Sequence, residues 1–465
     1  MHQTEPTEAR ANPVSPGRLL PPAGGNFRWV ICGLLFFSVA VNYIDRNIIG
    51  ILKMPLSREL GWGETDYAHI AAAFQFAYAC GYLFGGRMMD WLGVKRGLPA
   101  VVLLWSIAAA AHGLCSFIPA GDIFSLSLPW TSSVAKTLTW SVPTTVFGFM
   151  AARVTLGLAQ GGNFPGAIKA VAEWFPVKER ALATGLFNAG TNVGAIICPI
   201  AVPWMYAAWG WPLTFYVTGA LGLFWVVAWW LLYDAPDQHR LLSASERDYV
   251  QGGRPQPGEK KASVPWLSLL GYRAVWAYLI ASILAGPVWG IYMFFLPDFL
   301  DKRYHIPLEQ IGWWTAGFYF IAAFGGVAGG WLAGKLIDRG WSVNAARKIS
   351  LLLCAVAVVP VFLAPYVPSV WLTVLIVGIA GSAHQGWSAN LFSFVSDTMP
   401  GQAISSVVGL GGFVSYLTGA AIAELIGYIL KTSGSYVTIF AGASMMYVLS
   451  LLVLHLLVPR IQPNA

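Results

Sequence analysis

Long apolar runs recur along the whole chain and constrain its fold more than any other feature. Each is about 17 to 25 residues long, enough to cross the hydrocarbon core of a bilayer as a helix. Their centres lie near residues 40, 76, 107, 153, 192, 223, 285, 324, 358, 382, 416 and 446. Only 11% of the 465 residues are charged, against about 25% in soluble domains. We therefore predict an all-α membrane protein with twelve transmembrane helices.

Polar segments divide these runs into two groups of six. Residues 234–272 are rich in charge, Pro and Gly, as expected of a linker. We predict a disordered tail over 1–27, a first six-helix half over 28–233, the linker, and a second half over 273–460. The tail lacks the pattern of a cleaved signal peptide, so the first helix is expected to direct insertion.

The distribution of Lys and Arg predicts the orientation. The net charge is +7, and most basic residues, including Arg87, Arg180, Lys260 and Arg347, fall on one side of a twelve-helix threading. Because cytoplasmic loops carry the excess of Lys and Arg, we predict that both termini are cytoplasmic. The expected location is a bacterial-type inner membrane, and the expected partner of this positive charge is the lipid bilayer rather than nucleic acid.

The chain shows no pattern typical of an enzyme, a metal site or a cofactor site. Its five cysteines lie at scattered spacing within apolar runs, which suits neither disulfides nor metal ligation. We find no phosphate loop and no nucleophile elbow. We predict a protein that is not an enzyme and needs no cofactor.

The two halves contain matching segments. In "GRMMDWLGVKR" (86–96) and "GKLIDRGWSVNAARK" (334–348), Gly86 and Asp90 match Gly334 and Asp338. A second pair is "EWFPVKERALATGL" (173–186) and "DTMPGQAISSVVGL" (397–410), at a smaller offset. The change of offset places an insertion in the first half, which we assign to residues 118–142 on the periplasmic side. Parallel repeats of this kind build secondary transporters with a substrate site near the midplane.

These segments resemble a known family. The loop with Gly86, Asp90, Gly93 and Lys95 is similar to the signature loop of the major facilitator superfamily. "NYIDRN" (42–47), the segment 153–195 and "AHQGWSANLFSFVSDTMP" (383–400) resemble the anion:cation symporters, most closely the hexuronate (glucuronate and galacturonate) transporters. The resemblance implies the major facilitator fold, alternating access and proton symport. It also implies a cytoplasmic gate, which we assign to Gly86, Asp90, Gly93, Lys95, Arg96 and Asp338.

An acid and a base stand side by side in the first apolar run, as Asp45 and Arg46. An ionisable residue inside a span is a functional candidate, because burying an unpaired charge in hydrocarbon is costly. The Arg46 guanidinium matches a carboxylate in bidentate geometry, so we predict that it anchors an organic anion. Asp45 is predicted to carry the proton. The alternative is that Asp45 only neutralises Arg46, although neighbouring residues on a helix point about 100° apart.

Arg153 is the second cation within a span, and we include it in the predicted substrate site. Gln160 lies two turns later on the same helical face. The resemblance implies an acidic residue at this position, where Gln160 cannot titrate. Asp45 would then be the sole proton carrier, or the coupling would be weakened or lost.

Neutral polar residues gather on several other spans and are candidates to bind sugar hydroxyls. In the membrane, such groups also form hydrogen bonds between helices, and this alternative stays open for each of them. His384 is either a proton carrier or a neutral imidazole bonded to a neighbouring helix. The remaining predicted substrate residues are Tyr43, Gln75, Tyr78, Asn188, Thr191, Asn192, Trp289, Tyr292, Gln385 and Asn390.

We predict from these features a secondary active transporter that imports a sugar-acid monocarboxylate, foremost a hexuronate, with protons, and that functions as a monomer. Transport of an aldonate or aldarate, or uncoupled uniport, is the nearest alternative. An aldarate, with two carboxylates, would favour joint use of Arg46 and Arg153. A membrane sensor that binds without transporting is an alternative of a different class.

Overall fold

The computed structural model describes residues 25–119, 121–129, 137–252, 266–400 and 403–461. The first part contains α1 (Phe27–Ile51), α2 (Lys53–Leu60), α3 (Glu64–Leu92), α4 (Val94–Leu114), η1 (Cys115–Phe117), β1 (Ile123–Pro129), β2 (Thr137–Pro143), α5 (Thr144–Gln160), α6 (Asn163–Trp174) and α7 (Val177–Leu232). The second contains α8 (Ala244–Gly252), α9 (Trp266–Leu269), α10 (Arg273–Tyr304), α11 (Leu308–Asp338), α12 (Val343–Val358), η2 (Val359–Tyr366), α13 (Val370–Thr398), α14 (Ile404–Ser433) and α15 (Val437–Leu457).

Nine helical stretches among the described residues are long and apolar enough to span a membrane. One of them, Leu182–Leu232, is 51 residues long and is divided at Gly210, whose positive φ of 76° turns the chain before Pro212. The helix α3 carries charged residues near both ends, and α5 is followed by Gly161 and Gly162 before α6 begins. Three further crossings add to these nine stretches: α3, α5 and α6 taken together, and the second segment of the divided α7. The described chain therefore crosses the bundle twelve times.

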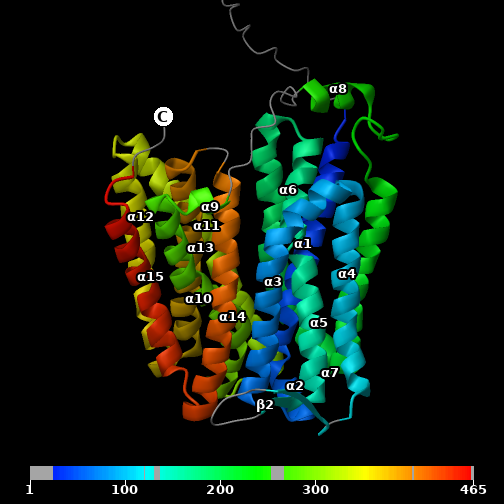
Figure 1. The fold of residues 1–465 in the computed structure, drawn as a ribbon, viewed down its shortest axis with the longest axis vertical. Coiled ribbons are helices and arrows are strands. Elements are labelled where there is room, and N and C mark those ends of the chain that lie inside the picture. Colours follow the sequence, from blue (N-terminus) through cyan, green and yellow to red (C-terminus); the bar gives the residue numbers. More distant parts are fainter. Residues whose placement is uncertain (1–24, 120, 130–136, 253–265, 401–402, 462–465) are drawn as a thin grey trace, which may run out of the picture.

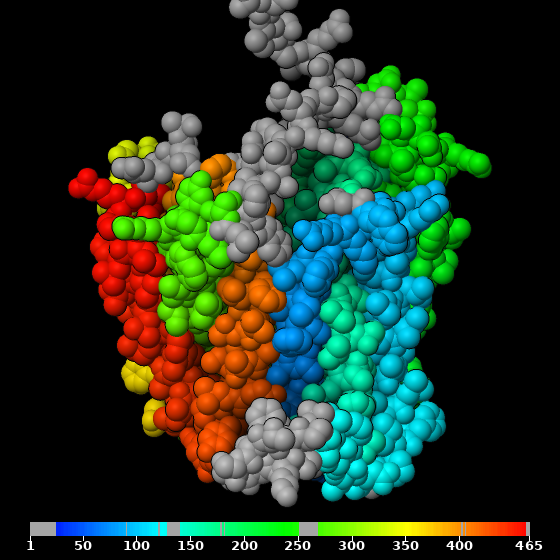
Figure 2. Space-filling view, viewed as in Figure 1, coloured from blue at the N-terminus to red at the C-terminus, as the bar shows by residue number. Residues whose placement is uncertain are grey.

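The helices form two bundles that lie side by side (Figure 1). The first half comprises α1 to α7 and the second half comprises α10 to α15. The bundles meet where α14 packs on α3, α11 on α7 and α10 on α1. Figure 2 shows α14 and α3 in contact along one face of the molecule. This is the all-α architecture that the sequence predicts.

Each end of the bundle has its own feature (Figure 1). At one end, which we call the hairpin end, β1 and β2 pair in antiparallel register, with Ile123 opposite Pro143 and Ser127 opposite Thr139. This hairpin lies within the predicted insertion 118–142 and the residue that follows it. The opposite end, which we call the linker end, carries α8.

The α8 helix is attached to the first half. The buried Glu246 carboxylate accepts hydrogen bonds from the backbone N–H groups of Phe27 at 3.1 Å and Arg28 at 3.2 Å. It therefore satisfies two of the N–H groups that the start of a helix leaves without intrahelical partners. The Arg28 guanidinium pairs with Glu246 and with Glu179 of α7, each at 2.9 Å. Because Arg28 belongs to α1, this part of the predicted linker packs as a component of the first half.

Candidate functional site

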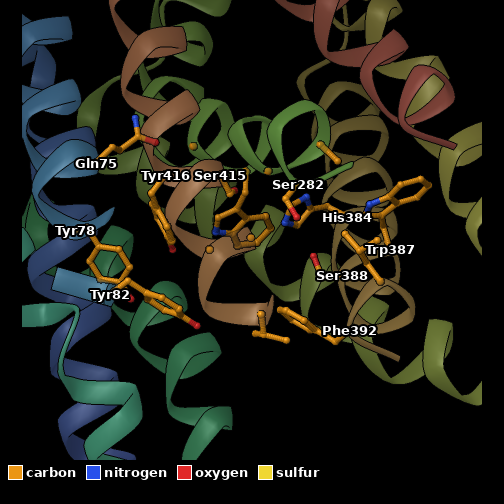
Figure 3. Close-up of a pocket in the computed structure, with 18 of the residues that line it drawn as sticks. Gln75, Tyr78, Tyr82, Ser282, His384, Trp387, Ser388, Phe392, Ser415 and Tyr416 are labelled. Atoms are coloured by element: carbon orange, nitrogen blue, oxygen red, sulfur yellow. The ribbon is translucent and has the colours of Figure 1, made fainter. Parts of the chain in front are cut away.

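A cavity of about 350 Å³ lies between the two halves. The first half contributes side chains from α1, α3, α6 and α7, and the second half from α10, α13 and α14. Figure 3 shows these side chains converging from the two bundles. The polar and aromatic residues lining the cavity include Arg46, Gln75, Tyr78, Tyr82, Asn188, Tyr278, Ser282, Trp289, His384, Trp387, Ser388, Ser415 and Tyr416.

Arg46 provides the positive charge of this cavity. Its guanidinium carbon lies 4.4 Å from the ring centroid of Tyr78, 4.8 Å from that of Tyr43 and 5.5 Å from that of Phe74. Its Nη2 donates to the side-chain Oδ1 of Asn42 at 3.1 Å, whereas its Nε has no hydrogen-bond partner among the described residues. Aromatic faces stabilise a desolvated cation without using its N–H donors. The guanidinium is thus held at the wall of the cavity by aromatic rings and by Asn42.

Asp45 lies on another face of α1 and does not line the cavity. Its side chain is buried, and neither carboxylate oxygen has a hydrogen-bond partner among the described residues. The hydroxyl of Thr218 in α7 lies beside it. The two adjacent charges therefore point apart, as the helical geometry predicts.

Arg153 lies behind α1 rather than in the cavity. It is fully buried, and its Nη1 donates to the backbone carbonyls of Asp45 at 3.3 Å and Arg46 at 3.4 Å. Its Nε and Nη2 have no hydrogen-bond partner in the described part of the chain. Gln160, two turns further along α5, donates from Nε2 to the Asn42 carbonyl at 3.1 Å. Both side chains support the α1 segment that carries Asp45 and Arg46.

The wall formed by the second half is aromatic and rich in hydroxyls. The Trp289 ring stacks on His384 with centroids 5.1 Å apart and an interplanar angle of 19°. Nδ1 of His384 lies 2.5 Å from the Tyr447 hydroxyl, which places the imidazole in contact with a neighbouring helix. Ser282, Ser388 and Ser415 supply hydroxyls from three helices. Such a surface suits the C–H face and hydroxyls of a small polar molecule.

An ion-pair network joins the halves at the hairpin end. Nζ of Lys53, in α2, lies 2.7 Å from Asp298 of α10 and 2.8 Å from Glu64 of α3. Lys302 pairs with Asp298 at 3.0 Å and also with Glu64, while the Tyr436 hydroxyl donates to Asp298. The Lys53 and Asp298 side chains are only 3% and 5% exposed. This network closes the bundle between the cavity and the hairpin end.

The predicted substrate residues do not all meet at the cavity. Of these, Arg46, Gln75, Tyr78, Asn188 and Trp289 line it. Tyr43 packs over Arg46, whereas Arg153, Thr191, Asn192, Tyr292, Gln385 and Asn390 are not among the residues that line it.

Three of these residues have visible structural contacts instead. The Asn390 amide donates to the carbonyls of Gly329 at 3.0 Å and Gly386 at 2.9 Å, joining α13 to α11. The Thr191 hydroxyl donates to the carbonyl of Asn188 in its own helix at 2.8 Å. Tyr292 is buried and packs against Phe318. A polar side chain in a membrane helix can bond to a neighbouring helix as readily as to a ligand, so polarity alone does not distinguish the two roles.

The predicted gate residues lie at the linker end. Gly93 has a positive φ of 71° in the turn between α3 and α4. Lys95 pairs with Asp234 at 2.9 Å, which holds the pKa of the Asp234 carboxyl below its ordinary value. Gly86 lies in α3 and Arg96 in α4, and Asp338 is exposed at the end of α11. The Asp90 side chain lies outside the described residues.

Several cavity residues were not predicted. Tyr82, Ser282, Trp387, Ser415 and Tyr416 line the cavity, and the ring centroid of Tyr416 lies 4.4 Å from that of Tyr78 across the interface between the halves. The polar residues in "FVSYLTG" (413–419) were the available signal in α14. Hydroxyls occur on all faces of membrane helices, so this signal alone does not identify a lining face. In the described part of the chain, no group of His, Cys, Asp and Glu could hold a metal ion.

Residues 35–423 match the model of the Major Facilitator Superfamily. The chain is 29% identical to the "Hexuronate transporter" of Escherichia coli (strain K12) over 418 residues, covering 88% of both chains. It is 29% identical to the "Galacturonate transporter" of Dickeya chrysanthemi, covering 73% of this chain and 93% of that one. It is 27% identical to the "Probable galactarate/D-glucarate transporter GudP" of Bacillus subtilis (strain 168), covering 91% of both.

Solved structures share the fold. The crystal structure of a D-xylose-proton symporter has a TM-score of 0.71 at 14% identity and covers 95% of this chain and 100% of its own. A bacterial homolog of the human lysosomal transporter Spinster, in an inward-facing and occupied conformation, has a TM-score of 0.63 at 17% identity, with coverage of 93% and 96%.

Proposed function

The chain belongs to the Major Facilitator Superfamily, and from this premise we propose that it imports a sugar-acid monocarboxylate, foremost a hexuronate, by proton symport with alternating access. The names of the relatives from Escherichia coli and Dickeya chrysanthemi support this substrate class.

One observation carries the proposal. Among the described residues that line the cavity, Arg46 is the only Lys or Arg. A planar guanidinium takes a carboxylate through two parallel hydrogen bonds. The hydroxyl-rich wall of the second half faces the remainder of such a ligand. The site therefore suits a molecule with one carboxylate and several hydroxyls.

The position of Arg153 separates a monocarboxylate from an aldarate. An aldarate carries a second carboxylate, for which Arg153 was the candidate partner. That guanidinium lies behind α1, bonded to backbone carbonyls. A second carboxylate in the cavity would lose its hydration without gaining a cationic partner, which is costly. This supports a monocarboxylate, although the similarity to the GudP protein keeps aldarates as the second candidate.

Asp45 is the proposed proton carrier. It is buried beside Arg153 and Thr218, on the face of α1 turned away from the ligand. Protonation there changes the charge of the helix segment that carries Arg46 without competing for the same space. Because Gln160 cannot titrate, coupling rests on Asp45, and uncoupled uniport is the alternative mechanism.

We further assign the linker end to the cytoplasm and the hairpin end to the outside. The linker end carries Arg87, Lys95, Arg96 and Arg347, in accordance with the positive-inside rule. The ion-pair network then closes the outer side. A single chain encloses the cavity, which supports a functional monomer.

The test is uptake of labelled galacturonate and glucuronate by cells that lack their own carrier, at acidic and neutral external pH, with and without a protonophore. Acid-stimulated accumulation that the protonophore abolishes is the expected result. Asp45→Asn should then abolish accumulation but retain exchange of internal for external substrate. Equilibration that does not depend on pH would keep the substrate and reject the coupling, and absence of uptake of either acid would reject the substrate.

A further inference from the structure

We propose that His112 of α4 passes protons between the hairpin end and Asp45, along a buried polar path inside the first half that is separate from the substrate cavity. This proposal rests on the proposed proton coupling and adds a residue and a route to it.

His112 is a buried imidazole with one unused nitrogen. It is 1% exposed, and its Nδ1 lies 2.8 Å from the Ala108 carbonyl oxygen. A carbonyl only accepts hydrogen bonds, so Nδ1 carries the hydrogen and Nε2 presents a lone pair. Nε2 has no hydrogen-bond partner among the described residues. A buried acceptor without a hydrogen-bond partner loses its hydration without compensation, so such a group calls for an explanation.

The packing of His112 places it next to the coupling residues. Its ring stacks on Phe215 of α7 with centroids 5.0 Å apart, and it meets the edge of Phe149 of α5 at 5.2 Å. Thr218 follows Phe215 by three residues, and Arg153 follows Phe149 by four, so each lies one turn deeper on the same helical face. A turn rises about 5.4 Å, close to the span of one water molecule with two hydrogen bonds.

The side-chain atoms without hydrogen-bond partners near Arg153 include both donors and acceptors. Arg153 offers two free donors, Nε and Nη2, while Asp45 offers two free carboxylate oxygens and His112 offers Nε2. A buried water needs two to four polar partners, and this set provides donors and acceptors on both sides. His112 also lies within electrostatic range of Arg153. We therefore infer that water bridges the imidazole and the Asp45 carboxylate beside Arg153.

The ionisable groups around His112 limit which of them can carry the proton. An arginine side chain stays protonated in proteins, so Arg153 does not relay the proton. The Cys198 thiol near Arg153 donates to the Ile44 carbonyl oxygen at 3.5 Å. Within the described part of the chain, Asp45 is the carboxylate that interacts with Arg153. Among the ionisable groups of the adjacent elements, the Arg153 cation of α5 acts on His112. The same cation acts on Asp45 of α1 and on Cys198 of α7. The Tyr216 ring of α7 lies beside Gly113, the residue after His112, and Cys115 of η1 follows two residues later.

The proposed transfer conserves protons and requires no other reactant. His112 lies two residues before the end of α4 at the hairpin end. Hydronium there donates a proton to Nε2, forming an imidazolium that still donates from Nδ1 to Ala108. The imidazolium then donates through the bridging water to a carboxylate oxygen of Asp45. The imidazole returns to its neutral form and Asp45 becomes neutral.

The experiment compares wild type with His112→Asn, which keeps a donor for the backbone carbonyl but cannot titrate. Reconstituted protein is assayed for galacturonate accumulation driven by an acid exterior and for substrate exchange without a pH gradient. We expect accumulation to fall about tenfold or more and its pH dependence to flatten, with exchange within about twofold of wild type. Ser106→Ala is the matched control, because Ser106 is a buried polar residue of α4 that donates to Val102 within its own helix.

Accumulation and a pH profile like those of wild type in His112→Asn would overturn the proposal. Equal loss of exchange and accumulation would also overturn it, because it would indicate a structural role. If His112→Asn does not fold, His112→Gln receives the same two assays and decides the question. Failure of the proposed function is distinguishable, because wild type itself would then show no acid-driven uptake.

Discussion

Replacing Lys53 by methionine tests whether the buried ion-pair network holds the outer side closed. In the observed state, the variant would leave Asp298 buried with Lys302 and Tyr436 as its remaining partners. In a state open at the hairpin end, water would solvate Asp298, so the lost ammonium would cost little there. The substitution should therefore shift the population toward the outward-open state.

The size of this shift follows from burial. Removing one partner of a buried ion pair costs about 3–5 kcal/mol. Because Asp298 keeps the Lys302 ammonium at 3.0 Å, we expect about half of that, roughly 1.5–2.5 kcal/mol. This corresponds to a change of about 10- to 70-fold in the ratio of outward-open protein to protein closed at the hairpin end.

Thiol labelling from outside measures this population. Ser282 lines the cavity, so Ser282→Cys, with the five native cysteines replaced, reports outward opening to a membrane-impermeant maleimide. Lys53→Met should label faster by the factor above. Arg58→Met is the matched control, because Arg58 is 76% exposed and lies 4.0 Å from Asp301, and exposed pairs contribute little.

The double variant Lys53→Met/Asp298→Leu separates the ion pair from general loosening. Removing both charges leaves no buried carboxylate short of a partner, so labelling should return toward the wild-type rate. Labelling of Lys53→Met at the wild-type rate, or of the double variant as fast as the single variant, would refute the reasoning.

Three further predictions concern the cavity, the packing and the linker end. Arg46→Lys should lower kcat/KM for galacturonate uptake roughly 30- to 100-fold, about 2–3 kcal/mol, because an ammonium cannot form the bidentate pair. A Cβ at Gly325 would overlap the Ser382 carbonyl oxygen, whereas one at Gly326 meets nothing within 4 Å, so thermal unfolding should show Gly325→Ala destabilised by about 1–3 kcal/mol and Gly326→Ala nearly unchanged. Lys95 lowers the pKa of Asp234, so their pair is intact above the ordinary Asp pKa and is lost only as the pH falls through the lowered value. Lys95→Met should therefore leave the pH dependence of uptake unchanged between about pH 5.5 and pH 7.5, and a shifted profile would contradict this.

The fold was predictable because the length and apolarity of each helix can be read directly from its residues. A charged residue in an apolar span also stands out, which is why Arg46 and Asp45 were identified. Whether a side chain faces the cavity depends on how each helix is rotated, and neighbouring helices determine that rotation. Arg153 shows this limit, because its polarity suggested the cavity while its helical face turns it behind α1.

In the second half, the same limit applies to residues that line the cavity but were not predicted. Serine and tyrosine are common in membrane helices, so nothing in their identity distinguished Ser415 and Tyr416 as lining residues. Asn390, by contrast, is one of the predicted substrate residues, and the structure places its amide in a contact between α13 and α11. An amide buried in a helix contact and an amide exposed to a ligand both occur as a polar residue in an apolar span, so the sequence does not distinguish them.

The attachment of α8 to α1 makes part of the predicted linker a component of one half. Glu246 and Arg28 hold α8 on α1, and Arg28 also pairs with Glu179 of α7. The start of α1, the start of α7 and α8 are therefore joined by ion pairs within a single bundle. If the two halves move relative to each other during transport, α8 travels with the first half and its contacts need not be broken. The cost of such a motion then falls on the faces that the two bundles present to each other.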